Sequence, residues 1–233
     1  MQAILEILRR ASAEEAPHWE QFPYETADEN ETVATALVRL NEVLCAAGKN
    51  PIRWECSCLQ KKCGACAMVI SGKPMLACDA KLTDVQKHGA VRIEPLRKFP
   101  VITDLIVDRS ILFENLRTLS VWLEQAVIAQ GDRAALAYDA SRCLQCGCCL
   151  EICPNFCPGG SFFGMAGFAP AARLIAELPK AQRDALCKAY RAHIYEGCGK
   201  SLACRNICPA GIDIEHLMVN TNAAAVWKLP WRK

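Results

Sequence analysis

The sequence predicts an α+β chain in two parts, a module of strands and one helix followed by an all-helical module. The cysteines support two parts, because they fall at 45–78 and at 143–208 and residues 79–142 contain none. Strand and helix patterns mix in the first part, whereas only helical patterns recur in the second. Prolines interrupt the segment IEPLRKFPVITD. We therefore predict domains at 1–104 and 105–233.

The first part contains the predicted strands. Residues 2–8 and 19–25 are expected to form two of them, and AMVISGKPML predicts two short strands joined by a turn at SGK. Between these pairs, apolar residues recur at helical spacing. Thr32 is the predicted N-cap of that helix and Gly48 its stop.

The second part is predicted to be helical throughout. LFENLRTLSVWLEQAVIAQG has an amphipathic pattern that ends in glycine. ARLIAELP and AQRDALCKAYRAHIYEG predict two further helices, and DIEHLMVN predicts a last one capped by Asp213. The glycine-rich stretch GGSFFGMAGF is interpreted as a loop that packs aromatic side chains.

Composition narrows the class of protein. The formal charge is +2, so no nucleic-acid partner is expected. The N-terminus carries acids and arginines where a signal peptide needs an apolar core, and no apolar run is long enough to cross a bilayer. We expect a cytoplasmic protein, in which sixteen cysteines indicate metal or redox chemistry rather than disulfides.

The first cysteine group has the spacing of a plant-type ferredoxin. CLQKKCGAC followed by MLAC gives C-x4-C-x2-C and one distant cysteine, which is typical of a [2Fe–2S] cluster. A loop would wrap the cluster with three thiolates, and a fourth would arrive from the next strand or turn. A thioredoxin-like pair is the weaker interpretation, since no βαβ context is present. The predicted ligands are Cys58, Cys63, Cys66 and Cys78.

The second group consists of two runs that interleave. CLQCGCCLEICP follows C-x2-C-x2-C-x3-C-P, in which the fourth cysteine serves the other of two clusters. CGKSLACRNICP supplies the partners but has Ser201 where a further cysteine would complete a second copy. The predicted [4Fe–4S] ligands are Cys143, Cys146, Cys149 and Cys208. The predicted [3Fe–4S] ligands are Cys153, Cys198 and Cys204, and weak binding of iron by Ser201 keeps a fourth iron open.

The remaining cysteines are not expected to be ligands. Zinc explains one four-cysteine site well, but it explains interleaved runs closed by Cys-Pro poorly. GCGKS lacks the first glycine of a phosphate-binding loop, because Ile194 stands there, and no dinucleotide fingerprint occurs. No catalytic residue is therefore expected on this chain. The non-ligand cysteines are Cys45, Cys56, Cys148, Cys157 and Cys187.

Three clusters without a substrate-pocket signature indicate an electron relay. The order of these motifs resembles the iron–sulfur subunit of succinate dehydrogenase and fumarate reductase over nearly the whole chain, including CGACAM and LAC. The resemblance implies a β-grasp ferredoxin domain, a helical ferredoxin domain and clusters in the order [2Fe–2S], [4Fe–4S], [3Fe–4S]. It also implies an FAD-containing partner subunit at one end and a quinone, or a substitute carrier, at the other. A membrane-anchor subunit would hold the complex at the inner face of the cytoplasmic membrane, as in anaerobic respiration.

Four positions depart from the family pattern. The first run continues PNFCP, without the paired tryptophans of respiratory members, and Gly199 stands where histidine is frequent. Ser201 replaces a branched aliphatic residue, and Lys61 replaces a common glycine. These departures leave a second interpretation open, in which the chain relays electrons for another flavoprotein reductase. That enzyme would act on a different unsaturated acid with a soluble, non-quinone donor. A third class is a structural zinc or iron-sensing module without reversible redox chemistry.

Overall fold

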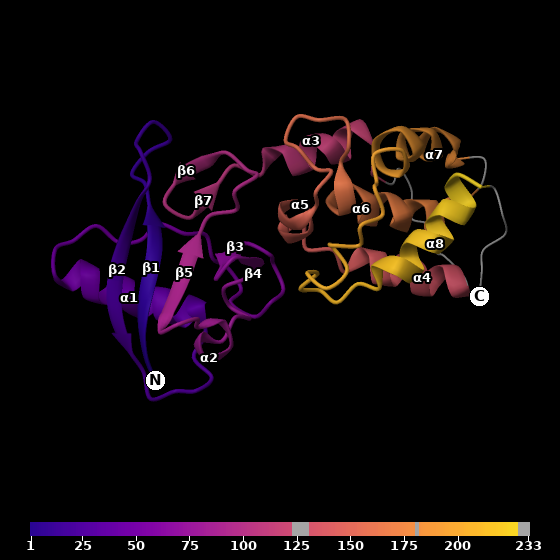
Figure 1. Ribbon diagram of the computed structural model, residues 1–233. Helices are drawn as coiled ribbons and strands as arrows, with labels where there is room; N and C mark the ends of the chain where they lie inside the picture. The colour runs from indigo at the N-terminus through magenta and orange to yellow at the C-terminus, as the bar shows by residue number, and fades with distance from the viewer. Residues whose placement is uncertain (123–130, 180–181, 228–233) are drawn as a thin grey trace. The chain divides into compact units, whose positions relative to one another are not determined.

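The computed structural model describes residues 1–122, 131–179 and 182–227, and it divides the chain into two compact units (Figure 1). The units are Met1–Asp108 and Arg109–Lys233. The first unit extends beyond the predicted boundary at residue 104 because Thr103 pairs with Ile106 across it. Each unit has a hydrophobic core of its own.

The first unit is built on a five-stranded mixed sheet with the order β2-β1-β5-β3-β4. β1 pairs antiparallel with β2 and parallel with β5, so the N-terminal strand lies inside the sheet. A two-stranded sheet of β6 and β7 follows. The strands are β1 (Gln2–Arg9), β2 (His18–Glu25), β3 (Ala67–Ile70), β4 (Lys73–Leu76), β5 (Ala90–Glu94), β6 (Val101–Thr103) and β7 (Ile106–Val107).

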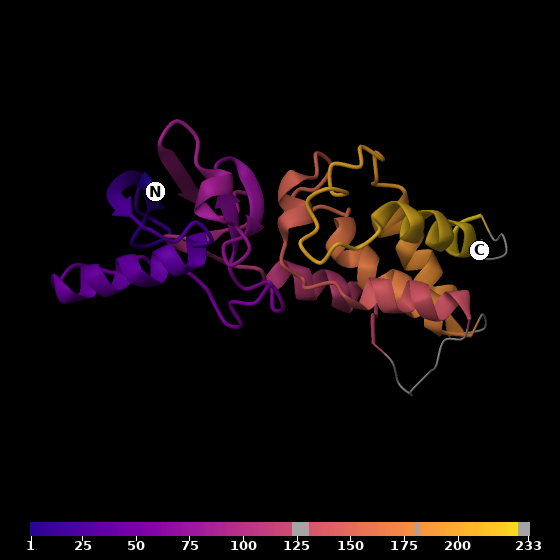
Figure 2. The same ribbon diagram turned by 90° about the horizontal axis from the view of Figure 1, so that it is seen from below.

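Helix α1 (Val33–Ala46) lies along one face of this sheet (Figure 2). Both of its ends are as predicted. The Thr32 side chain accepts a hydrogen bond from the Thr35 N–H, and Gly48 follows the helix with φ of 68°, a conformation that favours glycine. A short second helix, α2 (Leu82–Val85), precedes β5. The core between helix and sheet includes Leu5, Ile7, Leu37, Met68, Ile70 and Ile93.

The second unit packs its helices around α6 (Gly164–Glu177), which is buried on nearly all sides (Figure 1). Tyr190 is 1% exposed and donates a hydrogen bond to Asn222 Oδ1 at 2.7 Å, which joins the helices α7 and α8. The other helices are α3 (Ser110–Thr118), α4 (Asp132–Ser141), α5 (Cys148–Ile152), α7 (Asp184–Tyr190) and α8 (Ile214–Ala225), with a π-helical turn η2 at Arg191–Tyr195.

Two predictions for the second unit were wrong. The helix expected to run from residue 112 to a stop at Gly131 ends at Thr118 instead, and Ser120 has a positive φ of 53°. Gly131 is the N-cap of α4, and residues 123–130 of the predicted helix lie outside the described part. The glycine-rich stretch at 159–168 is also not all loop, because α6 begins at Gly164.

The remaining predicted helices are confirmed in type. ARLIAELP forms the second half of α6, and AQRDALCKAYRAHIYEG contains α7 and η2. Asp213 caps α8, since its carboxylate accepts a hydrogen bond from the His216 N–H at 3.0 Å. Mixed sheet first and helices second is the predicted fold class, which the structure confirms.

Candidate iron–sulfur sites

The first predicted site lies in the loop between α1 and β3, which approaches the turn after β4. Backbone N–H groups in this loop point at sulfur. Those of Gln60 and Lys62 donate to Cys58 Sγ at 3.3 Å, and that of Lys61 donates to Cys78 Sγ at 3.3 Å. Sulfur ligands of iron–sulfur clusters are stabilised by such donors. The loop therefore has the chemistry that a thiolate-bound cluster requires.

Left-handed backbone turns these amides inward. Leu59 has φ of 52° and Lys61 has φ of 59°, a region that non-glycine residues enter at a cost. Gly64 follows with φ of 76°. Because left-handed residues that alternate along the chain make successive N–H groups converge on one side, the loop forms a concave surface of donors.

The four cysteines of this site form two pairs. Hydrogen bonds from the backbone of Gln60 and Lys62, and a further one involving the Cys63 side chain, lower the pKa of Cys58 to about 7. Burial raises the pKa of Cys66 to about 12, with the Cys78 side chain as its hydrogen-bonding neighbour. Pairs of sulfurs fit a two-iron cluster, in which four thiolates are divided between two metal atoms. Among the described residues, no group of three histidine, cysteine or carboxylate side chains is arranged to hold a single metal ion.

The structure brings together the four cysteines that the spacing assigns to one cluster of the second unit. Burial raises the pKa of Cys149 well above its ordinary value, and the nearby charges of Cys146, Cys143, Cys208 and also Cys204 of the other predicted set contribute to the same shift. Burial likewise raises the pKa of Cys143 to about 11. Four neighbouring sulfurs in such a desolvated place become thiolates only with a cationic partner. An iron cluster would supply that charge.

The other three cysteines of the second unit form a neighbouring group. Burial raises the pKa of Cys204 to about 11, and the charges of Cys153, Cys198 and Cys208 add to the effect. Cys153, Cys198 and Cys204 line one small cavity, together with Ser201 and with Cys149 of the four-cysteine group. Ser201 thus lies beside the predicted three-iron site, in the place where the spacing expects a fourth ligand.

Two side chains that the spacing did not reveal contact the four-cysteine group. Gln145 Nε2 donates to Cys143 Sγ at 3.2 Å. A hydrogen bond with the Cys148 side chain is the largest of the effects that lower the pKa of Cys146 to about 7, and Cys148 itself is fully buried. Cysteine spacing identifies ligands but says nothing about such neighbours, so no signal in the sequence marked them.

The predicted non-ligands differ in their surroundings. Cys45, Cys56 and Cys157 are exposed, whereas Cys187 on α7 is half-buried. None of them is among the neighbours that act on the thiols of the predicted ligands described above. All sixteen cysteines are free thiols in the structure.

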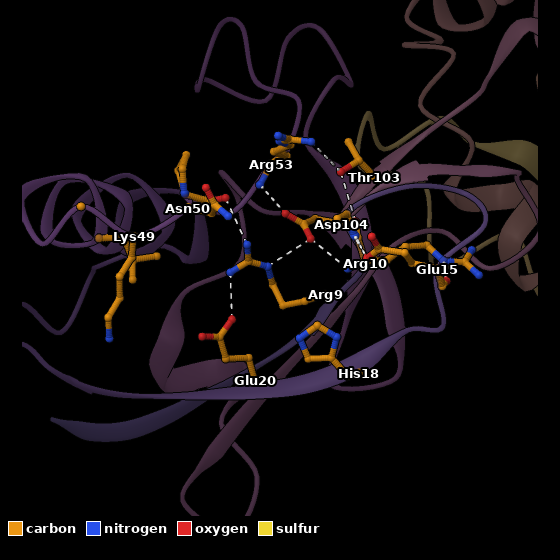
Figure 3. Close-up of a pocket in the computed structure, with 14 residues that line it drawn as sticks. Arg9, Arg10, Glu15, His18, Glu20, Lys49, Asn50, Arg53, Thr103 and Asp104 are labelled. Carbon is orange, nitrogen blue, oxygen red and sulfur yellow. Dashed lines mark hydrogen bonds and ion pairs between the residues drawn. The ribbon is translucent and has the colours of Figure 1, made fainter.

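A cavity of about 480 Å³ in the first unit is lined by charged side chains (Figure 3). Asp104, 3% exposed, accepts hydrogen bonds from Arg9 Nε at 3.0 Å and from the backbone N–H groups of Arg10 and Arg53 at 2.9 Å. Arg9 also forms an ion pair with Glu20 at 2.9 Å. Because these charges are matched within the protein, the cluster ties β1 to the segment after β6 and has the character of a structural network.

Comparison with known proteins agrees with this geometry. The model of the 2Fe-2S iron-sulfur cluster binding domain matches residues 4–114. The succinate dehydrogenase iron-sulfur subunit of Bacillus subtilis is 35% identical over 227 residues, which cover 89% of this chain and 86% of that protein. The chain belongs to the family of iron–sulfur subunits of succinate dehydrogenase and fumarate reductase.

Other matches extend the family relationship. The fumarate reductase iron-sulfur subunit of Mycobacterium tuberculosis is 32% identical over 203 residues, which cover 79% of this chain and 80% of that protein. A chain of the Mycobacterium smegmatis Sdh1 complex in the apo form matches the fold with a TM-score of 0.79 at 20% identity, covering 97% of this chain and 96% of that one. The predicted family and its α+β fold are thereby confirmed, and the chain is a subunit type of oxidoreductase complexes.

Within the described ranges, no helix combines the length and apolar character that a membrane span requires.

Proposed function

We propose that this chain relays electrons between an FAD-containing partner subunit and a quinone or another carrier through one [2Fe–2S], one [4Fe–4S] and one [3Fe–4S] cluster. The observation that carries the proposal is that the eleven cysteines selected by spacing act on one another as neighbours, four in the first unit and seven in the second. Such clusters, when bound, exchange single electrons and so connect a two-electron flavin to its redox partner.

The chain's own residues would bind and orient the three clusters. In the first unit, Cys58 and Cys63 would hold one iron and Cys66 and Cys78 the other, because the structure pairs them in this way. In the second unit, burial of the cysteines would exclude water and tune the potentials. The proposed [4Fe–4S] ligands are Cys143, Cys146, Cys149 and Cys208, and the proposed [3Fe–4S] ligands are Cys153, Cys198 and Cys204.

Electron paramagnetic resonance on the reduced complex, isolated without air, tests the relay. We expect the [2Fe–2S] and [4Fe–4S] signals in the reduced complex and the [3Fe–4S] signal, which belongs to the oxidised cluster, after oxidation. Replacement of the first two signals by the third on addition of fumarate identifies a dicarboxylate site in the partner. Signals that persist with fumarate retain the relay but point to a different flavoprotein substrate. Bound zinc, or iron and sulfide sufficient for fewer than three clusters, contradicts the proposal.

Paired substitutions test the ligand assignment. Cys153→Ser should remove the [3Fe–4S] signal and leave the [4Fe–4S] signal, whereas Cys208→Ser should do the reverse. Cys157→Ser, an exposed cysteine of the same unit, is the matched control and should leave all three signals. Because Cys148 is buried beside Cys146, loss of the [4Fe–4S] signal in Cys148→Ser shows that the choice between neighbouring cysteines is wrong only if Cys149→Ser retains that signal.

A second candidate is a relay for another flavoprotein reductase with a soluble donor. The cavity beside the proposed [3Fe–4S] site favours it, since polar Asn155, Lys200 and Ser201 line this cavity and none of its lining residues is tryptophan. Reduction of the clusters by added quinol counts against this candidate. Reduction by a soluble donor protein, with no response to quinol, counts for it.

A further inference from the structure

Gln145 lies between two of the proposed [4Fe–4S] ligands, Cys143 and Cys146. Its side-chain amide donates one hydrogen bond to Cys143 Sγ at 3.2 Å and another to the carbonyl oxygen of Ala166 in α6 at 3.0 Å. The orientation of the amide is determined by chemistry. Both neighbours are acceptors, so the nitrogen and not the oxygen must face them.

Two features of Gln145 are unfavourable in themselves. The residue has φ of 51°, the left-handed region that side chains other than glycine and asparagine rarely adopt. Its Oε1 atom is buried without a hydrogen-bond partner in the described structure. Backbone strain and an unpaired polar atom in the same residue indicate that the side-chain N–H groups of Gln145 have a function.

We propose that the Gln145 amide raises the reduction potential of the [4Fe–4S] centre by donating a hydrogen bond to the sulfur of Cys143. The inference rests on the proposed assignment of Cys143 as a ligand. Reduction adds one negative charge to the cluster and its thiolates, and a donor at a thiolate stabilises the charged state more than the uncharged one. Gln145 changes the reduction potential of the cluster through Cys143, so it is a positioning residue and touches no substrate.

A purely structural role is the competing explanation. The bond to Ala166 anchors the ligand loop to the central helix, and its loss would loosen the loop. Loosening predicts loss or broadening of the cluster signal, whereas the proposal predicts an intact signal with a lower potential. The two explanations therefore differ in a measurement that is independent of enzyme turnover.

The test is a redox titration of the purified complex followed by electron paramagnetic resonance, with the other two clusters as internal references. In Gln145→Leu we expect the reduced-to-oxidised ratio of the [4Fe–4S] centre at fixed potential to fall by on the order of tenfold, which is about 59 mV for one electron. Gln145→Glu should lower it further, since a carboxylate replaces the donor with negative charge. The exposed Gln182→Leu, in the same unit, is the matched control and should change nothing.

Gln145→Asn keeps the test decisive if the leucine variant fails to assemble. Asparagine tolerates the left-handed backbone, but its amide is one methylene shorter and should not reach Cys143. An intact signal at the wild-type potential in Gln145→Asn or Gln145→Leu overturns the inference. Loss of the signal in Gln145→Asn overturns it in favour of anchoring. Absence of a [4Fe–4S] signal from the unsubstituted complex is a different result and contradicts the proposed function itself.

Discussion

The two units stabilise their sulfur ligands by different means. In the first unit, backbone N–H groups of Gln60, Lys61 and Lys62 donate to sulfur, and the pKa of Cys58 is lowered. In the second unit, side chains such as that of Gln145 act on the ligands in addition to backbone groups, and burial raises the pKa of cysteines such as Cys143. The first arrangement depends on the path of the chain, and the second depends also on which side chains surround the site.

The position of the sulfur relative to the core differs as well. Of the proposed ligands of the first unit, Cys66 is buried, Cys58 and Cys78 are half-buried and Cys63 is exposed, while the sheet closes its own core with Leu5, Ile7 and Ile93. In the second unit, four of the seven proposed ligands pack directly against the buried cluster of apolar residues: Cys143, Cys149, Cys204 and Cys208. Folding and cluster binding should therefore be coupled much more tightly in the second unit.

Removal of iron should produce the largest difference between the units. After anaerobic chelation of the full chain, we expect amide hydrogen exchange to accelerate at least about 100-fold in α6 and α8, because buried thiols lose the metal that compensates them. Exchange in β1 and β5 should stay within about threefold, since these strands do not depend on the cluster loop. The measurement is hydrogen exchange followed by mass spectrometry.

Restoration of iron and sulfide supplies the control, because protection in the helices should return with the clusters. Equal loss of protection in both units contradicts the comparison. Protection of the helices from hydrogen exchange that survives complete removal of iron also contradicts the comparison.

Cysteine spacing selected residues that the structure brings close together, while their division into three ligand sets stays a prediction. Spacing along the chain is what a cluster demands of its ligands, so the candidate ligands follow from counting residues. The end of α3 at Thr118 could not be read in this way, because the apolar pattern continues beyond it. The start of α6 at Gly164 was hidden by its glycines, which normally disfavour a helix but here allow close packing against Leu150.

The departure from the family pattern at Gly199 is explained only by the three-dimensional structure. Gly199 leaves room for Asn155, since a Cβ at residue 199 would lie 2.9 Å from Asn155 Oδ1. The Asn155 amide in turn donates to the carbonyl oxygen of Gly197 at 3.1 Å, next to the proposed ligand Cys198. These two residues are distant in sequence, so a single sequence without an alignment carries no sign that they are coupled.

Substitution at this contact should have an intermediate effect. Gly199→Ala is expected to displace the Asn155 side chain and break its bond to Gly197, at a cost of about 1 kcal/mol or a fall of about 2–4 °C in melting temperature. Asn155→Ala should cost about the same for the same reason. In the double variant the two costs should not add, because alanine at 155 removes the atom that the new methyl group meets.

Thermal denaturation of the four proteins, with the clusters monitored by their absorbance, measures this coupling. Additive losses in the double variant contradict the contact. A melting temperature of Gly199→Ala equal to that of the unsubstituted protein contradicts it equally.

Lys61→Gly should have the smallest effect and tests the backbone side of the comparison. The variant loses the ion pair to Asp79 at 2.6 Å, between half-exposed side chains and worth about 0–1 kcal/mol. It gains relief of the left-handed strain at φ of 59°, offset in part by the greater freedom of glycine in the unfolded chain. The N–H that donates to Cys78 remains, so we expect an intact [2Fe–2S] signal and a melting temperature within about 2 °C.

Lys61→Pro is the contrasting variant at the same position. Proline removes the N–H and cannot adopt the positive φ, so the Cys78 sulfur loses its donor and the loop its shape. Loss of the [2Fe–2S] signal in Lys61→Pro but not in Lys61→Gly shows that residue 61 supports the cluster through its backbone. Loss of the signal in Lys61→Gly assigns that role to the lysine side chain. The proposed difference between the two units is then wrong at Lys61, where the backbone donor was expected to matter most.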